Sequence, residues 1–184
     1  MNTTNLNSQN SNLKPKEIHW SATKFFRRLT ESNKLARKLG FRFCRVSGLT
    51  GFEEAVTAMQ NTTAFVCVSD ISMGTSSMDN TPHMEKVKTV FLAMRHPIDD
   101  LTGREWCMKI MHELFRQFMS VLIKEKTKLE QDCIYVDERI TFREIDQYFF
   151  SGCAAAYFQI TVQKYVDLRF NEDEWEPPTI TEKK

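Results

Sequence analysis

The stretch TGREWCMKIMHELFRQFMSVLIKEKTKLE, residues 102–130, decides the fold of this 184-residue chain. Its apolar residues recur at steps of three and four, the spacing that places side chains on one face of an α-helix. They are Trp106, Ile110, Met111, Leu114, Phe115, Phe118, Val121 and Leu122. A helix of this length extends for about 40 Å, and we expect its polar far end to project beyond the core. The stretch therefore predicts one long amphipathic helix with an apolar face to bury.

Two β-like runs precede this helix and two follow it. Ala64–Ser69 is continuously apolar, which is typical of a strand buried on both faces, and Lys86–Arg95 is a second strand. Gly, Ser, Asn, Asp and Pro cluster in residues 71–84, which predicts a long loop at the tip of a hairpin. Ile134–Ile145 and Tyr157–Val166 alternate after the helix. This order predicts an α+β fold: a small, mostly antiparallel sheet packed against one long amphipathic helix, with N-terminal helices and extended terminal arms.

The residues before the first of these strands are expected to form short elements. Residues 16–39 have helical spacing and predict one or two helices, with a possible break at Ser32 and Asn33. Residues 41–46 alternate as in a short strand or an extended arm, Gly48 to Gly51 predict a turn, and residues 52–59 predict a short helix.

Length and patterning favour one domain with tails. We expect a flexible polar arm over residues 1–15, a single α+β domain over 16–170, and an acidic tail over 171–184. Within the domain, residues 16–45 form a basic helical part and residues 52–166 form the core.

The net charge of +1 conceals an asymmetry along the chain. Between Lys14 and Arg45 there are ten basic residues against two acidic ones, whereas the residues from Tyr165 to Pro178 hold five acids against one arginine. The basic part also contains phenylalanines, a mixture that suits nucleic acid. Two other interpretations of the basic part are equally open: it contacts an acidic protein surface, or it is simply exposed to solvent.

Composition limits the class of protein. An apolar fraction of 41% and a charged fraction of 27% are ordinary for a globular protein. No apolar run approaches the length of about 20 residues that crosses a bilayer, and the polar N-terminus does not resemble a secretory signal. The five cysteines are scattered without close pairing, which predicts reduced core thiols in a cytosolic setting.

No catalytic motif is complete. His112 and Glu113 begin a zinc-hydrolase HExxH motif, but Arg116 occupies the position of the second histidine. Asp70, Glu85 and Lys88 could serve a metal-dependent nuclease only if the loop folded them together, because the usual spacing is absent. No cysteine has a histidine at a spacing that would make it a nucleophile, and no phosphate-binding loop is present. We therefore expect no enzyme activity, no metal and no cofactor.

The order of elements resembles that of bacteriophage tail-terminator and tail-completion (neck) proteins. The likeness covers residues 52–166 and is carried by AFVCVSD, ISMGTSSMDN, VKTVFLAMRH, the helix from Thr102, RITFREID and YFQITV. The resemblance implies a non-enzymatic virion protein that forms rings, often hexameric, and binds tail-tube or head–tail connector proteins. It also implies assembly in the host cytoplasm and location in the phage tail or neck. Contact with DNA, if any, would not be sequence-specific, and no membrane is involved.

The partner-binding residues that we expect lie in three groups. Opposite charges at the two ends suit an interface that joins different patches of neighbouring copies. The groups are the basic residues Lys24, Arg27, Arg28, Arg37 and Arg42, the acidic residues Asp167, Glu172, Asp173 and Glu174, and the loop residues Met73, Ser76 and Met78. The alternative functions are a nuclease-like protein that uses Asp70, Glu85 and Lys88, and a DNA-binding adaptor that uses the basic part.

Overall fold

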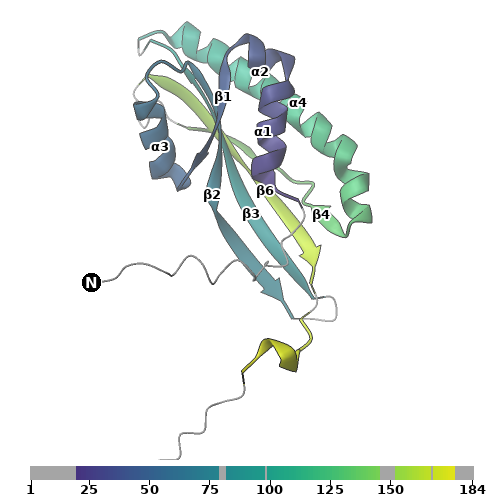
Figure 1. Cartoon of the computed structure of the whole chain (residues 1–184). Helices are drawn as coiled ribbons and strands as arrows, with labels where there is room; N and C mark the ends of the chain where they lie inside the picture. The colour runs from purple at the N-terminus through teal and green to yellow at the C-terminus, as the bar shows by residue number, and fades with distance from the viewer. Residues whose placement is uncertain (1–19, 79–81, 98, 146–151, 167, 177–184) are drawn as a thin grey trace, which may run out of the picture.

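Helices lie on both faces of one sheet in the computed structural model, which describes residues 20–78, 82–97, 99–145, 152–166 and 168–176 (Figure 1). The helices are α1 (Ala22–Ser32), α2 (Lys34–Lys38), α3 (Gly48–Ala58) and α4 (Leu101–Gln131), with a short 3-10 helix, η2 (Glu172–Glu174), near the end. The strands are β1 (Phe41–Val46), β2 (Ala64–Ser77), β3 (His83–Arg95), β4 (Ile134–Val136), β5 (Phe142–Ile145) and β6 (Cys153–Tyr165). The predicted α+β class is confirmed.

The sheet is mixed. Its strand order is β1-β2-β3-β6-β4, and β5 pairs with β6 as well. β1 runs parallel to β2, whereas the other pairings are antiparallel. The prediction of a mostly antiparallel sheet is therefore confirmed, with the edge strand β1 as its parallel member.

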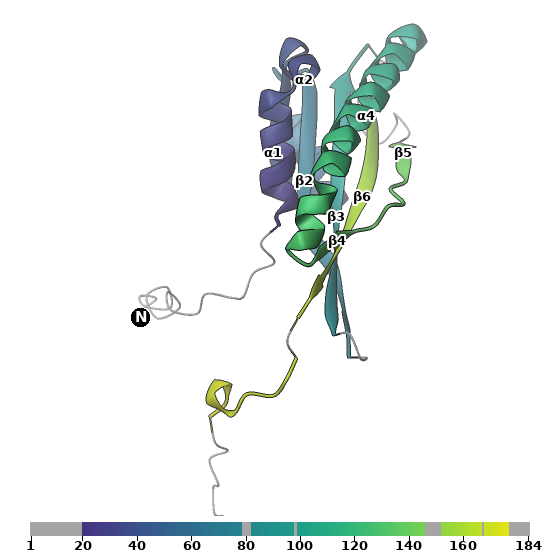
Figure 2. The same ribbon diagram turned by 90° about the vertical axis from the view of Figure 1, so that its right-hand side faces the viewer.

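Alternation along the strands divides the core into two layers. Val66, Leu92 and Phe158 point toward α1 and α4, which lie side by side on one face (Figure 2). Phe65 and Phe91 point to the opposite face, where α3 covers part of the sheet. Residues 65–68 of β2 are fully buried, which confirms the prediction of a strand covered on both faces.

The long helix forms where the sequence predicts it. Asp100 caps α4 by accepting a hydrogen bond of 2.8 Å from the Gly103 amide. Most residues of the predicted apolar stripe pack on the sheet. Trp106 is half exposed and lies outside the core. The far end of α4 does not project freely, because Leu129 packs into the same core as Ile134 of β4.

The N-terminal helices break at the predicted place. Asn33 ends α1 and caps α2, since its side-chain oxygen accepts from the Ala36 amide at 2.8 Å. Phe26 anchors α1, with its ring beside Phe118 of α4 and Phe158 of β6. Helix α3 begins earlier than expected: the turn predicted at residues 48–51 is wrong, because these residues form its first turn.

The loop predicted over residues 71–84 is largely wrong. β2 continues to Ser77 and β3 starts at His83, with a register shift between Val68 and Ser72. The ends of these two strands and of β6 pair as a ribbon, and the tip of this ribbon extends past the helices (Figures 1 and 2). We call residues 72–77, 83–88 and 160–165 the strand extension.

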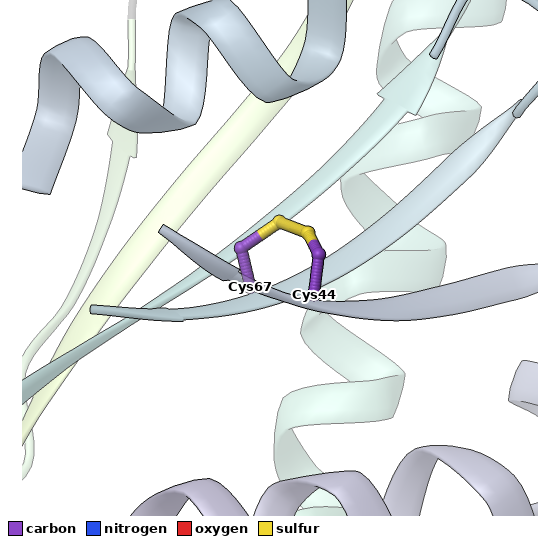
Figure 3. The surroundings of a disulfide bond; sticks show 2 residues. All are labelled: Cys44 and Cys67. Carbon is purple, nitrogen blue, oxygen red and sulfur yellow. A yellow bond between two sulfur atoms is a disulfide. The ribbon is translucent and has the colours of Figure 1, made fainter. Parts of the chain in front are cut away.

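Two of the five cysteines are paired. Cys44 of β1 and Cys67 of β2 are register partners with Cα atoms 4.7 Å apart, and they form a disulfide that joins the edge strand to its neighbour (Figure 3). The prediction of five reduced thiols is therefore wrong for these two, which are 23 residues apart in sequence. It is also wrong to place Cys133 in the core, because that residue is exposed. Cys107 and Cys153 are free and buried, as predicted.

This arrangement predicts the outcome of thiol labelling. In the native, unreduced protein we expect a maleimide to label Cys133 alone, because Cys107 and Cys153 are buried. Unfolding without reductant should expose all three free thiols, and unfolding with reductant should expose all five cysteines. Intact-mass spectrometry counts the labels. Five labels after unfolding without reductant would show that Cys44 and Cys67 are not bonded.

Candidate functional site

Of the three residues of the nuclease alternative, Asp70 and Lys88 lie together, but Glu85 lies apart from them. Lys88 lies on the face of the sheet that carries α1 and α4, and its Nζ donates to the Asp70 backbone oxygen at 2.6 Å rather than to the carboxylate. Glu85 lies on the opposite face, where it accepts from Gln163 at 3.0 Å. Among the described residues, no group of three or more His, Cys, Asp or Glu side chains could hold a metal ion.

The incomplete HExxH motif forms ordinary helix-surface pairs. His112 Nε2 lies 3.1 Å from Glu144 Oε1 of β5, and Arg116 holds Glu113 through two hydrogen bonds. Hydrogen bonds from Arg116 and Gln117 lower the pKa of Glu113 to about 2. A general base needs a pKa near the working pH, so this carboxylate is poorly suited to take a proton.

That shift predicts the titration of Glu113. Its pKa is depressed from an ordinary value of 4.5, so the interaction stabilises the fold above that pH and is lost as the pH falls through about 2. NMR titration of the side-chain carboxyl carbon should give a midpoint near 2 in the wild type. In Arg116→Met with Gln117→Leu the midpoint should return toward the ordinary value. An ordinary midpoint in the wild type would contradict these hydrogen bonds.

The two buried free cysteines are poor nucleophiles. Burial raises the pKa of both Cys107 and Cys153, which keeps the sulfur protonated. Cys107 Sγ lies 4.0 Å from the Arg95 backbone oxygen. These environments agree with the predicted role in core packing.

The predicted basic residues occupy two faces of the molecule. Lys24, Arg27 and Arg28 are exposed on α1, where Arg28 pairs with Glu125 of α4 at 2.6 Å. Arg37 is exposed on α2. Arg42 is paired with Phe65 in the register and therefore lies on the α3 face of the sheet. The five residues do not form one patch.

The predicted loop residues lie on the strand extension and its tip. Met73 is 70% exposed and Met78 is 89% exposed, and Ser76 is exposed between them. Soluble proteins rarely concentrate large apolar side chains on a projecting part unless that part meets another molecule. The strand extension is therefore a candidate contact surface.

The predicted acidic residues that are described lie on a segment that leaves the domain. Glu172, Asp173 and Glu174 form η2 and are exposed, while Asp167 lies outside the described residues. The same segment carries Phe170 and Trp175, which are 72% and 67% exposed and stack on each other at a ring-centroid distance of 6.0 Å. We call residues 168–176 the acidic–aromatic segment. The sequence predicts the charge of this segment, but it does not indicate that the two aromatic side chains are exposed.

A basic pocket is the feature that sequence reasoning missed. Its cavity of about 320 Å³ lies where α1 begins and has mainly polar walls. Arg45 of β1, Ser72 of β2, Lys86 and Lys88 of β3, and residues 20–23 line it. The available signal was the alternation of Lys86 and Lys88, which places both on one face of a strand.

A second, apolar groove crosses the α3 face. Its cavity of about 530 Å³ is bordered by Leu49 at the start of α3, Met73 and Val87 of the strand extension, and Ile145 and Tyr157. Among the described residues that line it, Glu144 is the one charged residue, so these walls hold no cluster of charged groups. This composition suits contact with another apolar surface.

None of the described helices is both long enough and apolar enough to cross a membrane. No protein-family model matches the chain, and a search of curated proteins returns no significant match.

Proposed function

We propose that this protein is a non-enzymatic structural component that assembles into a ring of identical copies, as a bacteriophage tail-terminator or head–tail neck protein does. Its partners would be further copies of itself and tail-tube or connector proteins. Its place would be the virion, after assembly in the host cytoplasm.

The acidic–aromatic segment is the observation that carries this proposal. Phe170 and Trp175 gain little from folding within one chain, because both remain largely exposed to water. Aromatic side chains of this kind are enriched in protein–protein interfaces, where they supply much of the binding energy. A segment that presents them away from the domain is suited to bind another molecule.

The strand extension supports the same proposal from a second direction. It presents Met73 and Met78 to solvent with 70% and 89% of their surface exposed, and methionine adapts well to a partner surface. Two separate contact regions on one subunit suit a ring, in which each copy binds a neighbour on either side or an axial partner.

The oligomeric state of the purified full chain tests the proposal. We expect size-exclusion chromatography with light scattering to give one closed multimer, and negative-stain micrographs to show rings. Phe170→Ser with Trp175→Ser should shift the protein to monomer. The control Trp106→Ser, which removes an exposed tryptophan of α4, should leave the multimer intact.

A monomer at every attainable concentration, with no rings in micrographs, would contradict the proposed function. Binding of DNA by that monomer, weakening steeply with salt, would favour the adaptor alternative instead.

A further inference from the structure

The basic pocket concentrates positive charge with little compensation. Arg45 pairs with Val68, and Lys88 pairs with Ser72, so both basic side chains lie on the face that carries α1. None of the described residues that line the cavity is acidic. Because the N-terminal end of a helix carries a partial positive charge, the start of α1 adds to the field.

The basic groups are close enough to influence one another. Desolvation is the main cause that lowers the pKa of Lys88, and the charges of Lys86 and Arg45 lower it further while Asp70 raises it. Lys88 is held by the backbone oxygens of Ser69 and Asp70. Lys86 and Arg45 are exposed, and they face the cavity. The pocket therefore favours an anion with several negative charges.

Trp20 adds a hydrogen-bond donor and an aromatic wall. It lines the pocket, and its Nε1 is buried without a hydrogen-bond partner in the part of the chain that the structure describes. A buried donor of this kind is costly to leave unpaired. An occupant with carboxylate oxygens beside an apolar group would match this wall.

The chain itself carries such an occupant. The acidic–aromatic segment holds four acidic residues against one arginine, and two aromatic rings flank its acidic core. Asn171 caps η2 by accepting from the Asp173 amide at 3.2 Å, which presents the acidic side chains on one short turn. Residues 1–19 are a poorer match for a basic pocket, because they contain two lysines and one acid.

The segment points away from its own pocket. The Val166 amide donates to the Pro82 oxygen at 3.1 Å, which fixes the end of β6 at the tip of the strand extension. From this tip the segment continues away from the domain. The start of α1, where the basic pocket lies, is in the opposite direction, back from the tip toward the helices (Figures 1 and 2). Its nearest suitable partner is therefore a second copy.

We propose that the acidic–aromatic segment of one copy docks in the basic pocket of the next copy. This inference rests on the proposed self-assembly and names the contact that produces it. Such an interface joins two different patches, so repetition closes a ring when the rotation between copies allows it.

A charge-swap experiment on the full chain tests this contact. The pocket variant carries Arg45→Glu and Lys86→Glu, both at exposed positions, and the segment variant carries Asp173→Lys and Glu174→Lys. Each variant alone should assemble about 100-fold more weakly than the wild type, since like charges then face each other. The control Arg37→Glu with Lys38→Glu, at exposed positions of α2, should assemble normally.

Mixing the two variants is the decisive step. Each segment then meets a pocket of opposite charge on the other variant, so light scattering should show assembly restored in the mixture. Circular dichroism of each variant checks that the fold is intact. Assembly by the pocket variant alone would overturn this contact, and so would failure of the mixture to assemble although both variants fold. If the wild type still forms a ring, the proposed function stands even when this contact is overturned. Loss of bound nucleic acid from an intact ring of the pocket variant would overturn it too, in favour of a nucleic-acid site.

Discussion

Replacement of Phe158 with alanine is expected to lower the free energy of unfolding by about 4 kcal/mol. Phe158 is fully buried in the middle of β6, where its ring lies 5.6 Å from that of Phe26 and 4.9 Å from that of Phe115. The residue therefore joins the sheet to α1 and α4 at one point. Truncation leaves a cavity between three rigid elements that cannot all collapse into it. Urea denaturation followed by circular dichroism measures the loss.

Phe170→Ala is the matched control, because it removes the same side chain from an exposed position of the monomer. Its free energy of unfolding should change by no more than about 0.5 kcal/mol when measured on monomeric protein. A loss below about 1 kcal/mol for Phe158→Ala would mean that α1 and α4 do not pack on β6 as described.

Replacement of Arg95 with methionine is expected to cost about 3 kcal/mol. Arg95 is the last residue of β3, and its side chain caps the C-terminal end of α3. Its guanidinium donates hydrogen bonds to the backbone oxygens of Val56, Met59 and Thr62. The group also lies over the Phe65 ring, 5.7 Å from its centroid. Hydrogen bonds from a charged donor are the stronger class, and carbonyls at a helix end have no partner within the helix.

Hydrogen exchange shows whether this loss has the stated cause. In Arg95→Met the amides of α3 should exchange faster, while those of α4 change little. Arg95→Lys keeps the charge but has fewer hydrogen-bond donors. Its α3 amides should therefore exchange at rates between those of the wild type and those of Arg95→Met. Arg37→Met, at an exposed position of α2, is the control. Unchanged exchange in α3 would contradict the capping role of Arg95.

Both predictions concern contacts between elements that are distant in sequence. The basic pocket is likewise built from residues that are distant in sequence. The acidic charge of the terminal segment could be predicted from composition. The basic pocket that we propose as its binding site could not be predicted in this way, because the basic residues expected from the sequence spread over α1, α2 and the α3 face of the sheet. Charge counted along a chain does not specify which side chains share a surface.

The sequence by itself determined the elements whose signals are local. Helix α4 follows from a stripe at helical spacing and an aspartate cap. Residues 157–165 of β6 follow from alternation, whereas residues 153–156 are all buried and show none. Both periods arise from the geometry of a single segment. The break at Asn33 is local for the same reason, since a side chain bonds a backbone amide three residues away. These elements and their order were sufficient to predict the α+β class.

Only the tertiary structure decided what depends on register. The Gly- and Ser-rich residues after Asp70 have weak strand propensity, yet pairing with β3 holds them in β2. The bond between Cys44 and Cys67 exists because parallel pairing places them opposite each other. Arg45 meets Lys86 and Lys88 for the same reason: strands fix which face each residue occupies, and only the pairing of distant strands fixes which residues meet there.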